Sequence, residues 1–355
     1  MNALSPFAPA QAYRSGATLD YHGTGMAAHF GNPAEEYRHA REEVVLFDRS
    51  DRGLLVATGR DRKAWLHGLV TNIVDGLPDY TGAYAFACNE KGRILFDANI
   101  LALPDALWLD VDLDLLPDAA AHLSRYIITE QVTLSEASGP HVRCAVSGPR
   151  AAEITERLGV ADLSELPPLA SRKLPAGAGL LFRHDLAGAA GFELILPREF
   201  AVRWWDRLAD WGARPAGLAV LDALRIEAGL PWSGRDLDET VLPPETGAGV
   251  RGLSYAKGCY IGQEVIERMR AHSVLARRLV KVRAESGDGL VLPTALRQSG
   301  REAGRLTSLV AHPRNPWWVG LAYIRTNLPH ADGLTAGEPA RPITIITASA
   351  AAVSR

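Results

Sequence analysis

Cys259 is the side chain of this sequence whose surroundings most favour chemistry. It lies between Gly258 and Gly262, and Lys257 precedes it by two residues. A helical pattern begins near Gln263, so the thiol is predicted to sit on a tight loop that leads into a helix N-terminus. A nearby cation and a helix N-terminus both favour the reactive thiolate over the thiol. The alternative is a small buried hydrophobic residue without a chemical role.

Two carboxylates interrupt apolar segments and are the next candidates. Asp97 follows the apolar residues 94–96, and Glu193 lies inside the apolar segment 192–196. Burying a carboxylate without a partner is costly, so each is predicted to be paired, hydrogen-bonded or functional. A carboxylate can also accept two parallel N–H donors in bidentate fashion. The alternatives are a turn-capping aspartate at a strand end for Asp97 and an exposed edge-strand residue for Glu193.

The other polar patterns are weaker evidence for a functional site. His272 follows Cys259 by thirteen residues, and a Cys–His hydrolase would need the two side chains together with an oxyanion donor. The histidines show neither an HExxH motif nor regular metal-ligand spacing, so no metal site is predicted. The basic segment 268–283 is most simply a solvated face. It lacks the interleaved aromatic residues of single-strand binders, so we expect no direct nucleic-acid binding.

Composition places the chain among ordinary globular proteins. It has 355 residues, 47% of them hydrophobic and 22% charged, with a formal net charge of −3. This length favours two or three domains. Cys88, Cys144 and Cys259 are far apart and form no CxxC pair, which excludes a zinc ribbon and fits a reducing cytoplasm. We see neither a secretory signal nor an apolar run of the ~20 residues that a membrane span needs.

The spacing of apolar residues predicts an α+β protein. Residues 1–31 show no clear periodicity and are predicted to be a partly ordered arm. From about residue 277 only short strands are predicted, which is typical of a small antiparallel β-barrel. Phe200, Trp204, Leu208 and Trp211 share one face of a predicted helix and are expected in the core. Helices are expected over 33–45, 61–70, 149–159, 198–211 and 218–228, and barrel strands over 278–284, 303–310, 317–325 and 342–348.

The segment 257–264, Lys-Gly-Cys-Tyr-Ile-Gly-Gln-Glu, ends at Glu264 and resembles a motif of the YgfZ/IBA57 family. That family comprises folate-binding proteins associated with iron–sulfur cluster assembly and repair. The wider superfamily is that of the glycine-cleavage T-protein, a tetrahydrofolate-dependent aminomethyltransferase. The resemblance implies a cloverleaf fold of two α/β lobes over residues 32–272 and a C-terminal antiparallel β-barrel domain over residues 277–355.

The same resemblance implies roles for individual residues. Glu193 matches the glutamate that accepts the paired ring donors of the pterin, and Asp97 matches an acidic residue near the reactive edge of the folate. Arg225 is implied as a folate contact or as the group that orients Glu193. Asn72 and Tyr84 match positions that line the folate channel. Tyr84 could stack on a flat ring, or it could be an alternating core residue of its strand.

The resemblance therefore implies a reduced folate, tetrahydrofolate or a derivative, as the ligand, and iron–sulfur assembly or client proteins as partners. Such clients include cluster-dependent enzymes that methylthiolate tRNA. One alternative is a tetrahydrofolate-dependent aminomethyl or methyl transferase with Asp97 as the acid–base group. It is weakened because Phe96 replaces a second carboxylate and because the loop 184–190 departs from the transferase pattern. The other alternative is a scaffold that keeps the fold without folate.

Overall fold

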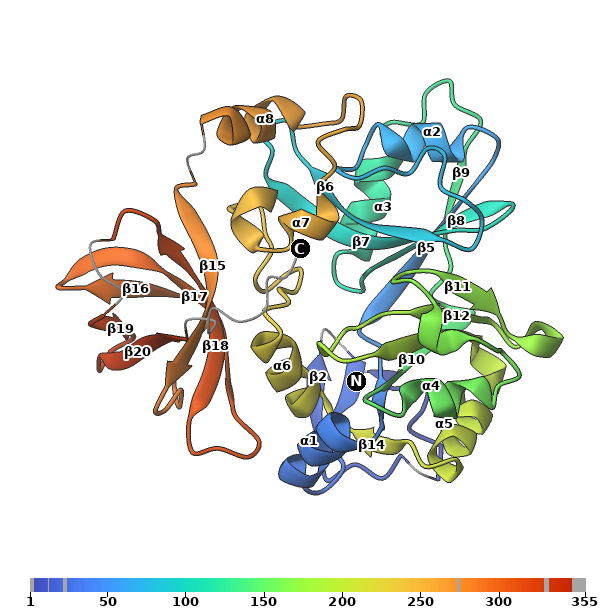
Figure 1. The fold of residues 1–355 in the computed structure, drawn as a ribbon, viewed down its shortest axis with the longest axis horizontal. Coiled ribbons are helices and arrows are strands. Elements are labelled where there is room, and N and C mark those ends of the chain that lie inside the picture. The colour runs from blue at the N-terminus through green and yellow to red at the C-terminus, as the bar shows by residue number, and fades with distance from the viewer. Residues whose placement is uncertain (1–2, 12, 22–23, 273–274, 329–331, 347–355) are drawn as a thin grey trace.

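Three lobes surround the middle of the molecule in the cloverleaf arrangement expected from the sequence (Figure 1). The computed structural model describes residues 3–11, 13–21, 24–272, 275–328 and 332–346. Two lobes each combine a sheet with helices and are called the mixed lobes, and the third is a closed β-barrel. Among the described residues no helix is both long and apolar enough to cross a membrane.

The first lobe is built on a six-stranded mixed sheet in the order β11–β12–β13–β10–β4–β14. Its strands are β4 (Val45–Asp48), β10 (His141–Ser147), β11 (Ser171–Lys173), β12 (Leu180–Arg183), β13 (Gly191–Pro197) and β14 (Arg214–Ala216). Its helices are α1 (Pro33–Glu42), α4 (Ala151–Glu156), α5 (Ala201–Asp210) and α6 (Leu218–Glu227). The helix α1 begins as predicted, because Asn32 caps its first amides and a proline follows at the first helical position.

The second lobe holds a five-stranded antiparallel sheet in the order β6–β7–β8–β5–β9. The strands are β5 (Arg52–Thr58), β6 (Gly82–Cys88), β7 (Ile94–Ala102), β8 (Ala106–Asp112) and β9 (Thr133–Glu136), with α2 (Arg62–His67) and α3 (Leu116–Ser124) packed beside them. The chain passes between the two lobes at residues 49–51, which join β4 to β5, and again at residues 137–140, which join β9 to β10. Side chains of these connections therefore lie where the lobes meet.

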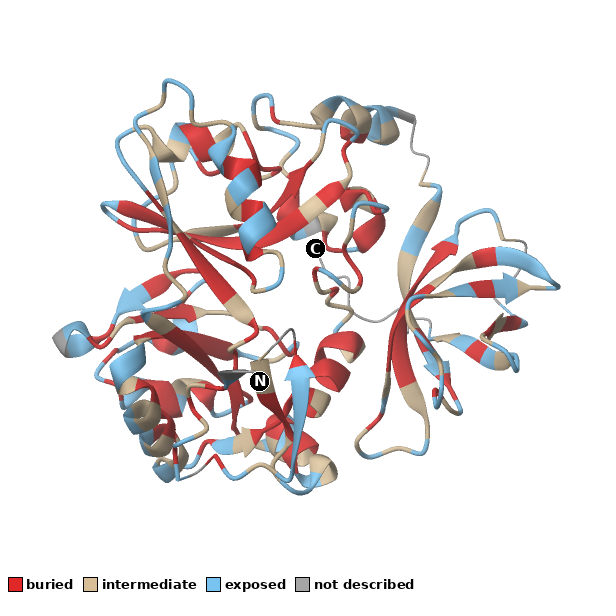
Figure 2. Cartoon of the chain, turned by 180° about the vertical axis from the view of Figure 1, so that it is seen from behind, coloured by how far each residue is buried: buried red, intermediate tan, exposed pale blue. Residues whose placement is uncertain are grey.

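The C-terminal lobe is the predicted barrel, closed in the order β15–β18–β17–β16–β19–β20. Its strands are β15 (Arg277–Ala284), β16 (Thr294–Gln298), β17 (Arg301–Ala311), β18 (Trp318–Arg325), β19 (Leu334–Ala336) and β20 (Arg341–Ile346). Between α6 and the barrel the chain forms α7 (Gly249–Gly252) and α8 (Gln263–His272). Buried residues fill the sheet interiors of the two mixed lobes, and several lie where α6 faces the barrel (Figure 2).

The first thirty residues are more ordered than the expected arm. The strands β1 (Ala3–Leu4), β2 (Ala17–Tyr21) and β3 (Thr24–His29) form a sheet in the order β1–β3–β2. Phe7 is fully buried and its ring lies 4.9 Å from that of Trp205 in the first lobe. The lack of periodicity reflects strands that are short and irregular, while the aromatic residues between them supply the packing.

The prediction for the aromatic stripe of α5 is correct only in part, because Leu208 is buried as expected but Trp205 is the tryptophan of this helix that lies in the core. Ala201, Trp205 and Leu208 are the buried residues of this helix, whereas Trp204 is only partly buried. Trp204 instead packs edge-on against Trp211. Both faces of α5 carry large apolar groups at helical spacing, so the sequence pattern does not distinguish them.

Candidate functional site

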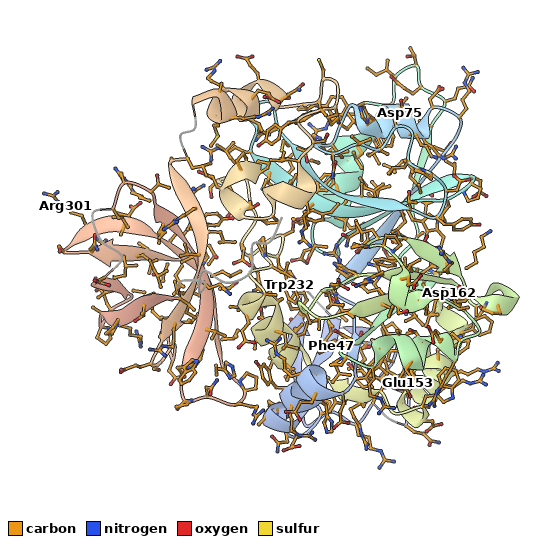
Figure 3. The ribbon with its side chains drawn as sticks, in the orientation of Figure 1. Phe47, Asp75, Glu153, Asp162, Trp232 and Arg301 are labelled. Carbon is orange, nitrogen blue, oxygen red and sulfur yellow. The ribbon has the colours of Figure 1, made fainter. Side chains whose placement is uncertain are left out.

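A small polar pocket of about 40 Å³ lies at the junction of the two mixed lobes. Tyr84 and Asp97 reach it from the second lobe, His184 from the first, and Trp232 from the segment after α6. Trp232 lies near the middle of the molecule in Figure 3. The other lining residues are Arg49, Arg52, Asn99, Leu186, Leu230, Pro231 and Arg251. The structure thus brings two of the predicted site residues, Asp97 and Tyr84, to one cavity.

Asp97 is held at this pocket by two hydroxyl donors. The Tyr84 hydroxyl donates to Oδ2 of Asp97 at 2.7 Å, and the Ser233 hydroxyl donates to Oδ1 at 2.5 Å. Burial and the charge of Asp97 raise the pKa of Tyr84 well above its usual value. Asp97 stands inside β7 rather than at its end, so the turn-capping alternative is wrong. The carboxylate is 8% exposed and is a hydrogen-bond acceptor fixed in position.

Glu193 is fully buried beneath the pocket and does not line it. Its Oε1 accepts from Arg49 at 3.1 Å and from His184 at 2.6 Å, and its Oε2 lies 3.6 Å from Nε of Arg143. Burial alone would raise the pKa of Glu193, but the charges of Arg49, His184 and Arg143 outweigh it and lower the pKa to about 2. The strand β13 lies between β12 and β10, so the edge-strand alternative is wrong.

The geometry alters the implied pterin contact of Glu193. Arg49 and His184 stand between this carboxylate and the cavity, and both line the cavity themselves. No hydrogen bond to Oε2 is present among the described residues. Glu193 therefore positions two basic side chains in this conformation, and a ligand ring would reach it only after His184 or Arg49 moves.

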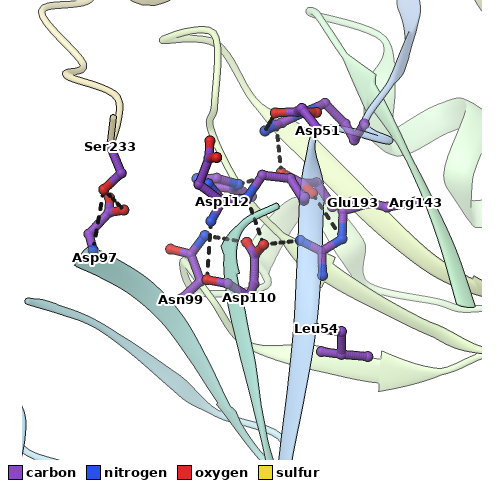
Figure 4. A network of polar contacts seen from close by, with 12 residues as sticks. Asp51, Leu54, Asp97, Asn99, Asp110, Asp112, Arg143, Glu193 and Ser233 are labelled. Carbon is purple, nitrogen blue, oxygen red and sulfur yellow. Dashed lines mark hydrogen bonds and ion pairs between the residues drawn. The ribbon is translucent and has the colours of Figure 1, made fainter. Parts of the chain in front are cut away.

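A buried ionic network surrounds Glu193 where the lobes meet (Figure 4). Arg49 forms a fork with Asp51, with both N–O distances 2.9 Å. Asp110 accepts from Arg52 at 2.7 Å, from Asn99 at 2.7 Å and from Arg143. Each arginine is nearly or fully buried beside a carboxylate, which is the condition under which a buried charge is tolerated.

Asp112 is the carboxylate of this region that lacks an arginine partner among the described contacts. Its Oδ1 accepts from the backbone N–H of Asp114 at 3.1 Å. Burial raises its pKa to about 7, although the charge of Arg52 opposes the shift. Asp112 therefore changes charge near neutral pH.

Sequence reasoning missed Arg49, Arg52, Arg143, His184 and Trp232. The pattern Asp-Arg-Ser-Asp-Arg at 48–52 is the signal that could have indicated the first two. Alternating charges after an apolar strand are typical of an exposed turn, so the pattern does not by itself indicate a buried site. Here the segment crosses from one lobe to the other, with Asp48, Arg49 and Asp51 buried and Arg52 partly buried.

Arg225 does not take either of its implied roles. It is fully buried in α6, where it donates to Asp222, to Asp236 and to Oγ of Ser308 at 2.7 Å. Ser308 belongs to β17, so Arg225 links α6 to the barrel. No described contact joins Arg225 to Glu193, but its guanidinium lies 4.8 Å from the centre of the Trp232 ring and donates to the carbonyl of Leu230 at 3.3 Å, so it supports two residues of the pocket wall without lining the pocket itself. The three side chains that accept its hydrogen bonds come from α6 itself, from the segment after it and from the barrel.

Asn72 braces the pocket wall instead of facing a ligand channel. Its Nδ2 donates to the backbone carbonyls of Tyr84 and Arg251, each at 2.9 Å. The Arg251 guanidinium in turn lies 4.5 Å from the centre of the Tyr84 ring. Tyr84 is thus packed by a cation on one face, and its alternative reading as a strand core residue fits its 7% exposure.

Cys259 is exposed, whereas Cys88 and Cys144 are buried. Hydrogen bonds to Thr71 fix the start of its loop. The Thr71 hydroxyl donates to the carbonyl of Gly252 at 2.6 Å, and the Ser254 amide donates to the carbonyl of Thr71 at 3.0 Å. The thiol is therefore presented at the surface by a backbone that is attached to the second lobe.

Gly262 shows why the motif needs a glycine after the cysteine. Its φ is +82°, and a Cβ there would lie 2.5 Å from the carbonyl oxygen of Asn89 in the β6–β7 turn. A Cβ at Gly258 would meet nothing within 4 Å. Only Gly262 is therefore required by conformation and by close approach.

Lys257 contacts the backbone at the end of α2 and the Tyr260 ring, and no described contact joins it to the Cys259 thiol. Its ammonium donates to the backbone carbonyls of His67 and Val70, at the end of α2, and lies 4.8 Å from the centre of the Tyr260 ring. Cations at helix C-termini satisfy carbonyls that have no partner within the helix. Burial lowers the pKa of Lys257 to about 8. The expected activation of Cys259 by Lys257 has no support in these contacts.

The remaining motif residues begin α8. Gln263 is its first residue, and Glu264 forms an exposed i,i+4 ion pair with Arg268. The side chain of His272 lies outside the described residues, so the Cys–His alternative stays a prediction. Within the described part of the chain, no group of three or more His, Cys, Asp or Glu side chains could hold a metal ion.

Comparison with known proteins identifies the relatives of this chain. The GCVT N-terminal domain family matches residues 8–251. An aminomethyltransferase of Caldanaerobacter subterraneus subsp. tengcongensis is 31% identical over 74% of this chain and 72% of the relative. An aminomethyltransferase of Thermoanaerobacter pseudethanolicus is 30% identical over 75% of this chain and 74% of the relative. The glycine cleavage system aminomethyltransferase T of Bartonella henselae has the same fold, with a TM-score of 0.86, 19% identity and coverage of 98% of this chain and 97% of that one. The chain belongs to the GCVT domain family of the T-protein superfamily.

Proposed function

We propose that this protein binds tetrahydrofolate or a derivative at the central pocket and supports the assembly or repair of iron–sulfur clusters. The observation that carries the first half is the fixed Asp97–Tyr84 pair at the lobe junction of a GCVT-family chain. The second half rests on Cys259, an exposed thiol on an anchored loop whose sequence resembles the YgfZ/IBA57 motif.

The pocket lining suits a flat polar ring in its chemistry. Asp97 and Asn99 offer acceptors, Tyr84 and Trp232 offer aromatic surface, and Arg49 and His184 offer donors. The volume of about 40 Å³ is close to that of one water and far below the ~300 Å³ of small-molecule sites. Binding therefore requires the wall to open, and Trp232 and Arg251 belong to segments outside both sheets.

Within that site the chain's own residues have separable tasks. Asp97 accepts a hydrogen bond or a proton from a ligand N–H, since its carboxylate is held by Tyr84 and Ser233. Glu193 keeps Arg49 and His184 in place. Bound tetrahydrofolate would supply a carrier for one-carbon units.

The iron–sulfur role is tested by a genetic experiment. A strain that lacks this protein is supplied with the parent chain, Cys259→Ser, or Gly258→Ala as a control on the same loop. We expect the parent and Gly258→Ala to restore a cluster-dependent enzyme such as a tRNA methylthiolase, and Cys259→Ser to fail. Full restoration by Cys259→Ser would end the proposed role of the thiol.

The alternative of an aminomethyl or methyl transferase has one observation in its favour, because both matched relatives are named aminomethyltransferases. Against it, Phe96 points into the core of the second lobe, on the face of β7 opposite to Asp97. Incubation with an aminomethyl donor distinguishes the two: a transferase forms methylenetetrahydrofolate, whereas a carrier protein does not. A scaffold that has lost the folate site would neither bind tetrahydrofolate nor form methylenetetrahydrofolate.

A further inference from the structure

A second pocket, of about 230 Å³, lies on the lobe junction beside the central one. It lies at the two connections between the lobes and at the starts of β5 and β10, which follow them. Leu4 and Thr24 of the N-terminal sheet also line it. Its charged lining consists of Arg52, Arg143 and Arg198, with His141 beside them, and no Asp or Glu lines it. Only Arg52 also lines the central pocket.

Arg143 is the buried arginine of this pocket, and its contacts hold it in place. It is 4% exposed, its Nη1 donates to Asp110, its Nε faces Glu193, and the Phe182 ring covers it at 5.7 Å. Among the described residues no hydrogen bond is made by its Nη2. In Figure 4 one amino group of this guanidinium points away from both carboxylates. A buried arginine with free donors facing a cavity is prepared to bind an anion.

Arg52 and Arg198 supply further N–H donors to the same pocket. Arg52 uses Nε and Nη2 on Asp110, so its Nη1 has no partner among the described residues. Arg198 uses Nε on the carbonyl of Gly139 at 2.7 Å and makes no described ion pair. Behind the pocket, the charges of Arg49, Arg52 and Arg143 are balanced by Asp51, Asp110 and Glu193. The charges of Asp97 and Asp112 also act on Arg52. Arg198 is outside this network and is the lining guanidinium that has no described carboxylate partner.

We propose that this pocket binds a small oxyanion, a phosphate or carboxylate group of a small molecule, through Arg143, Arg52 and Arg198. Planar guanidinium groups match both anions with two parallel N–H donors. The pocket holds several water volumes of about 30 Å³ each but is smaller than the ~300 Å³ of drug-sized sites, so it selects compact groups. The site requires no folate and does not depend on the central pocket being open.

The test is calorimetric titration of the full chain at low ionic strength with inorganic phosphate and, separately, with glutarate. We expect saturable one-site binding of at least one anion with a Kd below about 1 mM. The tighter of the two identifies the oxyanion as a phosphate or a carboxylate. Arg198→Gln, an exposed change that leaves the buried network intact, is expected to weaken that binding at least about tenfold.

Arg301→Gln is the matched control, because Arg301 is an exposed arginine of the barrel far from this pocket (Figure 3). It is expected to bind as the parent does. Two results would overturn the proposal: no saturable binding of either anion up to about 10 mM, or equal weakening in Arg198→Gln and Arg301→Gln, which would indicate only a general charge effect.

Discussion

The lobe junction and the Cys259 loop place their polar groups in opposite settings. Glu193 and Asp110 at the junction are nearly or fully buried, as is Arg225 between α6 and the barrel, and each has at least one partner from a distant segment. In the loop the side chain of interest is exposed, and the contacts that fix it come from the backbone.

The buried charged groups support the fold, whereas the loop presents the Cys259 thiol at the surface. A buried charge whose partners are removed costs several kcal/mol, so the junction residues are expected to control stability first. An exposed thiol on an anchored backbone can be replaced with little effect on folding. Loss of function without loss of stability is therefore expected at Cys259 and not at Glu193 or Arg225.

The largest effect is expected for Arg225→Ala. The change leaves Asp222 and Asp236 buried without their shared cation, and we expect a loss of about 3–5 kcal/mol in the free energy of unfolding. Urea denaturation measures it, with Arg301→Ala as an exposed control expected to stay within about 0.5 kcal/mol. Equal midpoints for the two variants would contradict the view that Arg225 ties α6 to the barrel.

Glu193→Gln should give a smaller loss that depends on pH. The folded pKa of about 2 lies below the ordinary value, so the ionised carboxylate stabilises the fold above the unfolded pKa. That contribution, about 2–3 kcal/mol, is present above about pH 4.3 and is lost as the pH falls towards 2. Unfolding curves at pH 7 and pH 3 should show a gap between parent and variant that narrows in acid. A gap that widens in acid would show that Glu193 is not stabilised as an anion.

Two glycines of the loop provide a matched pair. Gly262→Ala forces a Cβ against the carbonyl of Asn89 at a positive φ and should cost about 1–3 kcal/mol. Gly258→Ala meets open space and should change stability by less than about 0.5 kcal/mol. Thermal unfolding compares the two, and similar losses would mean that the loop is not seated on the β6–β7 turn as described.

The smallest effect on the fold is expected from chemical labelling of the thiols. Cys259 is exposed, while burial raises the pKa of Cys88 to about 12 and shields Cys144 as well. A thiol reagent should modify only Cys259 in the native protein, and the other two cysteines after unfolding. Mass spectrometry identifies the labelled residue. Modification of Cys144 in the native protein would show that the first lobe opens.

Local patterns predicted α1 and four of the six barrel strands, because these elements carry their own caps and alternation. The short strands β16 and β19 and the N-terminal strands β1–β3 were not predicted. Partners across the lobes could not be predicted in the same way. The i,i+3 spacing of Asp222 and Arg225 accounts for one ion pair, but the bonds of Arg225 to Asp236 and Ser308 come from the tertiary packing. Arg143 and His184 stand in unremarkable strand and loop positions, and only the packing of two sheets brings them to Glu193.

The most direct test of the proposed function is an anaerobic calorimetric titration with tetrahydrofolate. The parent chain, Asp97→Asn and the exposed control Asp75→Asn are compared (Figure 3). We predict micromolar binding by the parent and the control, and at least tenfold weaker binding by Asp97→Asn, a difference of about 1.4 kcal/mol or more. No binding by the parent, or equal binding by all three chains, would contradict a folate site at the Asp97–Tyr84 pocket.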